Sequence, residues 1–94
     1  MSGRQSPLRS VRHVAFGRAV REWRVRRDLS QEGLGFAAGL HRNYVGAIER
    51  GELNPTLRVV LKLADGLQVA PSELHRLAEE RLPEVEAWSD CRAG

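Results

Sequence analysis

The sequence predicts an all-α fold, a compact bundle of five helices. Apolar residues recur at helical spacing along most of the 94 residues, whereas the β-branched alternation that marks strands is missing. Capping and helix-ending residues recur so often that the expected helices are joined by loops of two to five residues. A chain of this length can bury one core but not two, so we expect a single domain.

The first helix is expected over roughly residues 12–28. Phe16, Val20 and Trp23 fall at positions i, i+4 and i+7, which places them on one side of a helix. Arginines occupy most of the remaining surface. This helix is therefore expected to pack against the rest of the domain by a single apolar stripe.

Two short helices are expected next, over about 31–38 and 42–50. Ser30 is a suitable N-cap for the first of them, and Gly39 is suited to the left-handed turn after its last residue. Two short helices joined by so tight a turn must cross at a large angle, which is the geometry of a helix-turn-helix.

Two more helices complete the predicted bundle. Thr56 is suited to cap the fourth helix, whose wide apolar face occupies residues 57–67. Pro71 suits the first position of the fifth helix, whose apolar stripe is expected to reach Pro83.

Composition divides the chain into three parts. Residues 1–11 form a basic N-terminal arm, residues 12–82 hold the helical domain, and residues 83–94 form a tail. The tail carries Val85 and Trp88 at helical spacing, so it could support dimerisation, bind a partner or cap the core.

Charge is distributed unevenly along the chain. Residues 1–50 contain ten arginines and four acidic residues, a net charge of +6, whereas residues 51–94 carry a net charge of −3. A basic first half suits an anionic polymer such as DNA, because phosphate contacts need clustered positive charge.

Several classes of function are excluded by what the sequence lacks. No apolar run approaches the roughly 18 residues of a membrane span, and the start lacks a signal peptide, so a soluble intracellular protein is expected. Cys91 is the single cysteine, which excludes an intrachain disulfide and a cysteine-based zinc site. His13, His41 and His75 are scattered, and no catalytic or metal-binding spacing occurs. We therefore expect no enzyme activity, no cofactor and no metal.

The third expected helix has the properties of a helix that reads DNA. It buries only Val45 and Ile48, which leaves polar residues at its leading end, where a helix in the major groove contacts base edges. Arg42 can donate two hydrogen bonds to guanine, Asn43 can pair with adenine, and the Ala47 methyl group can meet thymine. The residues expected to contact the sugar–phosphate backbone are Gln31, Tyr44, Arg50 and Asn54.

None of these residues alone indicates DNA binding, because a solvated polar helix face needs no partner. The combination is more specific. It joins a capped short helix, a glycine turn, and a second short helix that has two buried side chains and polar groups at its start.

The stretch from Phe16 to about Leu77 contains a set of specific motifs, namely Leu29-Ser30-Gln31, Ala38-Gly39, Tyr44, Ile48-Glu49-Arg50-Gly51, Asn54-Pro55 and the Leu-Ala spacing of the fourth expected helix. With these motifs it resembles the phage repressor and Cro family of helix-turn-helix DNA-binding domains. The resemblance implies a five-helix domain of the lambda-repressor type, in which Gln31 contacts phosphate and positions 42, 43 and 47 read bases. It also implies that Arg24 pairs with Glu49, and a bidentate pair there would fix the third helix against the first.

The sequence departs from the family's pattern at four positions. Gly33 and Gly35 replace better helix formers, which costs about 1 kcal/mol each relative to alanine, and Gly46 replaces a small polar residue. His41 stands where a serine or threonine cap is usual, and it is expected to be an exposed turn residue. We therefore expect the second and third helices to be less stable than is usual in the family.

Together these features predict a sequence-specific transcriptional regulator that binds double-stranded DNA. One small domain offers few base contacts, so a homodimer with two recognition helices about 34 Å apart on a palindromic operator is expected. A repressor of this kind, from a bacterium or phage, would work in the cytoplasm in association with the nucleoid. The alternative is an antitoxin-like module that binds a toxin or co-regulator and binds DNA secondarily.

Overall fold

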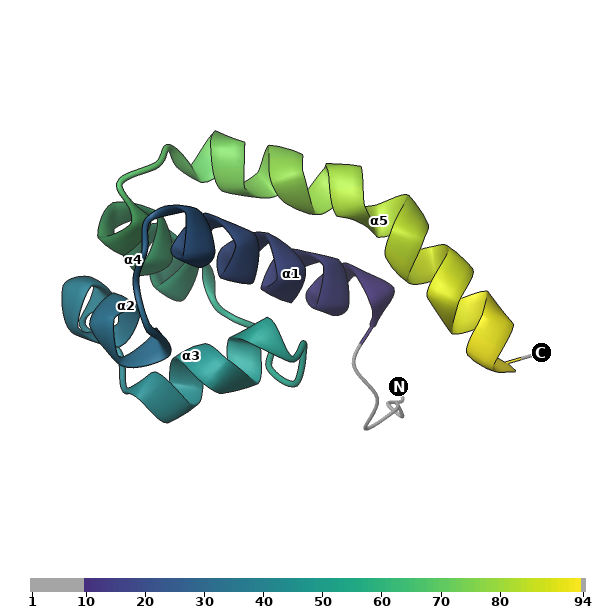
Figure 1. Ribbon diagram of the computed structural model, residues 1–94, viewed down its shortest axis with the longest axis horizontal. Helices are drawn as coiled ribbons and strands as arrows, with labels where there is room; N and C mark the ends of the chain where they lie inside the picture. The colour runs from purple at the N-terminus through teal and green to yellow at the C-terminus, as the bar shows by residue number, and fades with distance from the viewer. Residues whose placement is uncertain (1–9, 94) are drawn as a thin grey trace.

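The computed structural model describes residues 10–93, which form five α-helices joined by short turns (Figure 1). No strand occurs within these residues, so the predicted all-α fold is confirmed. Most of the predicted basic arm, residues 1–9, lies outside the described residues. The helices are α1 (Val11–Arg26), α2 (Gln31–Ala38), α3 (Arg42–Glu49), α4 (Leu57–Leu67) and α5 (Pro71–Ala93).

The first turns of three helices are closed by hydroxyl caps. The Ser30 hydroxyl accepts a hydrogen bond from the Gly33 N–H at 2.8 Å, and the Thr56 hydroxyl accepts one from the Val59 N–H at 3.3 Å. Ser10 caps α1 in the same way. Each cap satisfies an amide that the first turn of a helix leaves unpaired. The caps predicted for α2 and α4 are therefore confirmed.

α1 ends two residues before its predicted end. Asp28 takes a left-handed conformation with φ 59°, and the Leu29 N–H donates to the Arg24 carbonyl at 3.0 Å, which closes the helix. The apolar stripe could not locate this end, because glycine usually marks a left-handed turn and aspartate rarely does.

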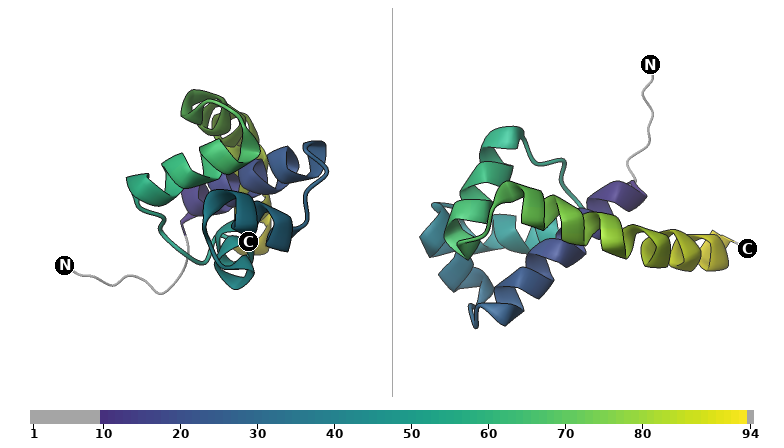
Figure 2. Two further views of the ribbon diagram at one scale, coloured as in Figure 1. Left: turned by 90° about the vertical axis from the view of Figure 1, so that its left-hand side faces the viewer. Right: turned by 90° about the horizontal axis from the view of Figure 1, so that it is seen from above.

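α5 continues through its predicted end. The apolar stripe predicts an end at Pro83, but the helix runs to Ala93 with Pro83 inside it. Val85, only 1% exposed, packs with Leu82 against Ala15 of α1 in a second small core. A proline inside a helix costs roughly 3 kcal/mol, and this apolar contact offsets part of that loss. The last turns of α5 extend past the other helices (Figure 2).

The main core lies around α1, which packs along α5 and crosses α3, while α4 packs against α2 (Figure 1). Two residues of the predicted apolar face of α4 are not part of this core, because Leu57 is 70% exposed and Leu61 is 43% exposed. Trp88 on α5 is also half exposed. The predicted core residues that are buried include Phe16, Val20, Leu34, Ala38, Val45, Ile48, Val60, Ala64, Leu67, Leu74 and Leu77.

Gly35 lies where α2 approaches the turn into α3. A Cβ atom at this position would collide with the Leu40 carbonyl oxygen and would lie 3.3 Å from the Arg42 backbone nitrogen. Alanine therefore does not fit here without a shift of the backbone. The expected loss of helix stability is estimated by comparing glycine with alanine. This comparison does not apply at position 35, where alanine does not fit.

Candidate nucleic-acid interface

α3 is held on one side and exposed on the other. Val45 and Ile48 are at most 1% exposed, and they fasten the helix to the core. Arg42 and Asn43, at the N-terminal end, are exposed. α3 lies at the surface of the bundle, below α1 in Figure 1. The helix is thus seated firmly while its leading residues remain open to a partner.

The His41 ring caps α3. Its Nδ1 atom accepts a hydrogen bond from the Asn43 N–H at 3.0 Å, and its backbone is extended, as is usual for an N-cap residue. His41 is exposed, as predicted. It also does what a serine or threonine would do at this position, which its place in the sequence did not indicate.

The residues predicted to read bases follow one another along α3. Arg42 and Asn43 are exposed, and Ala47, one helical turn after Asn43, is half-buried. Tyr44 differs from them, because it is half-buried and packs against the main core. Less of the Tyr44 ring is therefore available to DNA than its position in the sequence suggests.

An ion pair between Arg24 and Glu49 joins α1 to α3, as the family resemblance implies. Two guanidinium nitrogens of Arg24 lie 2.6 and 3.1 Å from the two carboxylate oxygens of Glu49, and a third donates to the Leu29 carbonyl at 2.8 Å. Only 12% of the Arg24 side chain and 3% of the Glu49 side chain are exposed. Since desolvation offsets much of the attraction, the pair sets the position of α3 more than it adds net stability.

Gln31 is the third member of this network. Its amide nitrogen donates to a Glu49 carboxylate oxygen at 3.0 Å, which holds the start of α2 against α3. A Cβ atom at Gly46 would lie 3.3 Å from the Gln31 side-chain oxygen and 3.1 Å from a guanidinium nitrogen of Arg50. Gly46, which the sequence marks only as a weak helix former, is therefore the point over which Gln31 and Arg50 converge.

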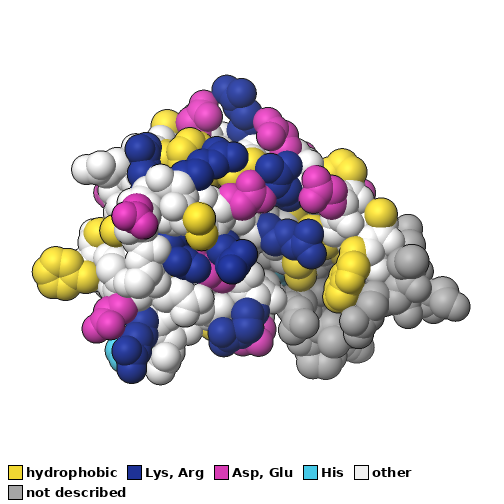
Figure 3. Space-filling view, viewed as in Figure 1, with side chains coloured by type: hydrophobic (Ala, Val, Ile, Leu, Met, Phe, Trp, Pro, Cys, Tyr) yellow, Lys and Arg dark blue, Asp and Glu magenta, His cyan; other side chains and the backbone are white. Residues whose placement is uncertain are grey.

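Two exposed glutamates, which the sequence did not single out, pair with the exposed arginines. Glu52 accepts hydrogen bonds from Arg50 at 3.0 and 3.2 Å, and a Glu32 oxygen lies 3.5 Å from an Arg42 nitrogen. The hydrogen bonds and charge of Glu52 raise the pKa of Arg50 above its usual value. Basic and acidic side chains lie interspersed over the face that carries α1 and α3 (Figure 3). The sequence could have indicated the Arg50–Glu52 pair, because these two residues are close in the chain, but it carries no comparable signal for the Arg42–Glu32 pair.

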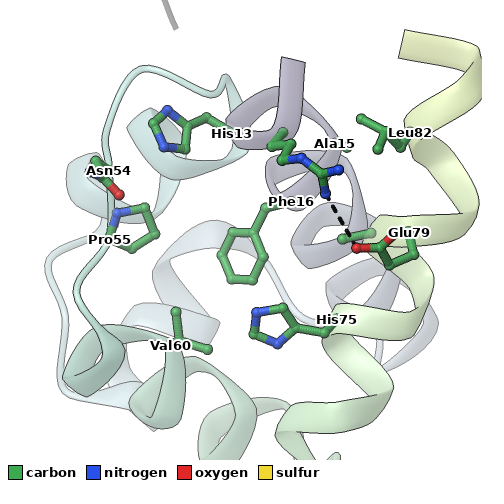
Figure 4. A pocket seen from close by; sticks show the side chains of 11 residues that line it. His13, Ala15, Phe16, Asn54, Pro55, Val60, His75, Glu79 and Leu82 are labelled. Atoms are coloured by element: carbon green, nitrogen blue, oxygen red, sulfur yellow. Dashed lines mark hydrogen bonds and ion pairs between the residues drawn. The ribbon is translucent and has the colours of Figure 1, made fainter. Parts of the chain in front are cut away.

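Asn54 lies beyond α3, on the loop to α4, where it lines a groove (Figure 4). The groove has a volume of about 240 Å³, and Arg12 pairs with Glu79 at its side, at 3.4 Å. Asn54 is exposed, as a backbone contact requires. The apolar residues that line the groove are Ala15, Phe16, Pro55, Val60, Ala78 and Leu82.

Among residues 10–89, whose side chains the structure describes, no three side chains form a cluster suited to hold a metal ion. In the described part of the chain, no helix is both long and apolar enough to cross a membrane. What the arrangement offers is a set of exposed hydrogen-bond donors and acceptors on a firmly seated helix.

Comparison with known proteins shows that the region around these helices matches a known family. A family model described as helix-turn-helix matches residues 20–74. The control protein C.BamHI of Bacillus amyloliquefaciens is 42% identical over 62 residues, which are 65% of this chain and 76% of that protein. The control protein C.SmaI of Serratia marcescens is 44% identical over 55 residues, which are 58% of this chain and 66% of that protein.

Solved structures have the same fold. The restriction-modification controller protein C.AhdI from Aeromonas hydrophila superposes with a TM-score of 0.68 and is 48% identical, over 69% of this chain and 98% of that chain. The wild-type restriction-modification controller protein C.Esp1396I superposes with a TM-score of 0.74 over 80% of this chain and 97% of that chain. It is 21% identical, so this second likeness concerns the fold alone.

Proposed function

This chain belongs to the helix-turn-helix family, and on that premise we propose that it is a sequence-specific DNA-binding transcriptional regulator. It acts as a repressor, in the cytoplasm and on the nucleoid, with α3 in the major groove of its operator. The observation that carries the proposal is that α3 is anchored in the core on one side and exposed at its N-terminal end. The helix is fastened by Val45, Ile48 and Glu49, while Arg42 and Asn43 at its leading end are exposed.

The relatives support a narrower role as a controller of a restriction-modification system. Two of them are named control proteins, and the solved chain that is 48% identical is described as a restriction-modification controller. We propose that the genes this protein regulates belong to such a system. The family model that matches residues 20–74 spans α2 and α3, the part of the chain proposed to contact DNA.

The proposed contacts follow from the chemistry of the exposed groups. The Arg42 guanidinium can donate two hydrogen bonds to guanine O6 and N7, and the Asn43 amide can pair with adenine N6 and N7. Ala47 brings a methyl group close to a thymine methyl group. Four residues contact sugar and phosphate and thereby set the register on the duplex, namely Gln31, Tyr44, Arg50 and Asn54.

The protein is proposed to act as a homodimer, because one α3 provides few base contacts. The surface best suited to a second copy lies on α4, where Leu57 and Leu61 are exposed one helical turn apart. Val60, between them in sequence, lines the apolar groove. A ridge beside a groove on one face is self-complementary, so a two-fold axis places the ridge of one copy against the groove of the other.

Selection of bound sites from random DNA tests the function. We expect an inverted repeat whose half-sites are about one helical turn apart, with an affinity that falls steeply as salt rises. Arg42→Ala should abolish operator binding without changing the melting temperature. Operator binding that persists in this variant contradicts the proposed reading helix. Loss of operator binding while a toxin or co-regulator stays bound favours the alternative, an interaction module.

Sedimentation tests the dimer surface. Leu57→Asp should convert a dimer into a folded monomer, because the charge would be buried at the interface. Val25→Asp is the matched control, since Val25 on α1 is also apolar and 57% exposed. The surface is wrongly assigned if both variants sediment as the unchanged protein does.

A further inference from the structure

The helix-turn-helix segment carries less positive charge than DNA binding would favour. Residues 30–56 contain two arginines, Arg42 and Arg50, against three glutamates, a net charge of −1. Glu49 is buried and paired with Arg24, so it does not face a ligand. The remaining exposed charges are the two arginines and Glu32 and Glu52, each arginine beside one glutamate. Phosphate attraction alone would select a more basic surface.

Glu52 engages the part of Arg50 that a phosphate would use. Nε and one terminal nitrogen of Arg50 donate to the two carboxylate oxygens of Glu52, at 3.0 and 3.2 Å. This two-point geometry is the same one in which guanidinium binds phosphate. The other terminal nitrogen lies beside Gly46, where the Gln31 side chain also lies. The carboxylate of Glu52 therefore engages two donors of Arg50 that a phosphate would otherwise use.

Glu32 holds the second exposed arginine in a looser way. Its carboxylate lies 3.5 Å from a terminal nitrogen of Arg42, and this ion pair joins α2 to the first residue of α3. Both side chains are more than half exposed, at 61% for Arg42 and 76% for Glu32. A guanine base can replace this partner with two direct hydrogen bonds, whereas an incorrect base cannot.

We propose that Glu32 and Glu52 limit the affinity for DNA, because they compete with it for Arg42 and Arg50. Every duplex must displace the two carboxylates, so this cost lowers the affinity for operator and random DNA by a similar factor. The operator offsets the cost with bidentate base contacts to Arg42, whereas other DNA offers no such contacts and binds only weakly. This inference rests on the proposed function, because it assigns a role to residues around the same helix.

The test measures binding to DNA that lacks the operator. The probe is a random-sequence duplex of about 30 base pairs. Its binding to the protein is measured by fluorescence anisotropy at about 50 to 200 mM KCl. The double variant E32Q/E52Q should bind it about 10-fold more tightly than the unchanged protein. The affinity should also fall more steeply with salt, by the change in slope that about one additional phosphate contact produces. Operator affinity should rise by a similar factor, so the ratio of operator to random affinity should stay the same.

Two controls separate the pairing from a general effect of charge. E84Q/E86Q makes the same change of charge on two exposed residues of α5, outside the helix-turn-helix, and should change the affinity less than about 2-fold. E32D/E52D keeps both charges but shortens both side chains, so it should release the arginines and raise the affinity for the random duplex about 3-fold. Circular dichroism verifies that each variant is folded.

Three results overturn the inference while the proposed function stands. In the first, E32Q/E52Q binds the random duplex with the same affinity as the unchanged protein. In the second, E84Q/E86Q gains as much affinity for it as E32Q/E52Q does. In the third, E32D/E52D binds it with the same affinity as the unchanged protein. If neither the unchanged protein nor E32Q/E52Q binds any duplex, and selection enriches no sequence, the proposed function fails as well.

Discussion

The α2–α3 unit and the α1–α5 pair are held together in different ways. α2 and α3 have eight residues each, and their arrangement is set by the buried network of Arg24, Glu49 and Gln31. α1 and α5 have 16 and 23 residues and pack along each other through apolar side chains. Two ion pairs also join them, Arg81 with Glu22 and Arg12 with Glu79, and both are more exposed than the Arg24–Glu49 pair. Polar contacts thus set the orientation of α3, which apolar contacts also hold, whereas α1 and α5 are joined mainly by apolar contacts.

The largest effect is expected at the centre of the polar network. Glu49→Ala leaves the buried guanidinium of Arg24 unpaired and Gln31 without its acceptor, which should lower the free energy of unfolding by roughly 3 kcal/mol. Operator affinity should fall together with the melting temperature, because α3 loses its fixed position. Chemical denaturation and DNA titration measure the two effects. An unchanged melting temperature would refute the structural role of the pair.

Glu22→Ala is the matched control for that experiment. It removes the carboxylate that joins α1 to α5, whose side chain is 33% exposed, so it should lower stability by less than about 1 kcal/mol. Operator affinity should stay the same, because α3 is not involved.

The second prediction concerns the apolar pair. Val85→Ala removes buried methyl groups from the contact with Ala15, which should lower the free energy of unfolding by about 1 to 2 kcal/mol. The affinity of the folded protein for its operator should not change. A loss of affinity at temperatures where the variant is fully folded would show that the packing of α1 on α5 also affects the orientation of α3.

The third prediction separates stability from binding within α3. Gly46→Ala improves helix propensity by about 1 kcal/mol, but the new Cβ atom would press on the side chains of Gln31 and Arg50. We expect a melting temperature equal to or above that of the unchanged protein, and an operator affinity several-fold lower. Gly33→Ala on α2 is the control, because there the nearest atom is the Ser30 hydroxyl oxygen at 3.2 Å. Equal operator affinity in both variants would contradict the proposed role of Gly46.

The smallest effect is expected from the pH dependence of the α1–α5 pair. The hydrogen bond from Arg81 is the main cause that lowers the pKa of Glu22 below its ordinary value of 4.5, against the opposite effect of burial. Because this pKa is lower in the folded state, the pair stabilises the fold above pH 4.5, and the stabilisation is lost as the pH falls through the folded value. The stability of Glu22→Gln should therefore decrease less than that of the unchanged protein under acid. Parallel decreases would argue against the pair.

Much of the fold could be predicted because its signals are local. The order of the five helices, the Ser30 and Thr56 caps and most of the buried positions depend on residues within one or two turns of each other. The Arg24–Glu49 pair joins residues far apart in the sequence, and only the resemblance to a known family made it predictable. Their spacing alone does not indicate that the two residues meet.

The sequence by itself determined that this protein is a helical bundle with a short exposed helix that starts with Arg42 and Asn43. The tertiary structure decided what lies against that helix. Gly17 lets α1 cross α3, because a Cβ atom there would lie 2.6 Å from the Glu49 carbonyl oxygen. The convergence over Gly46, and the passage of α5 through Pro83, likewise depend on neighbours distant in sequence. Helical periodicity reports which side of a helix is apolar, but it carries no information on how closely two helices approach.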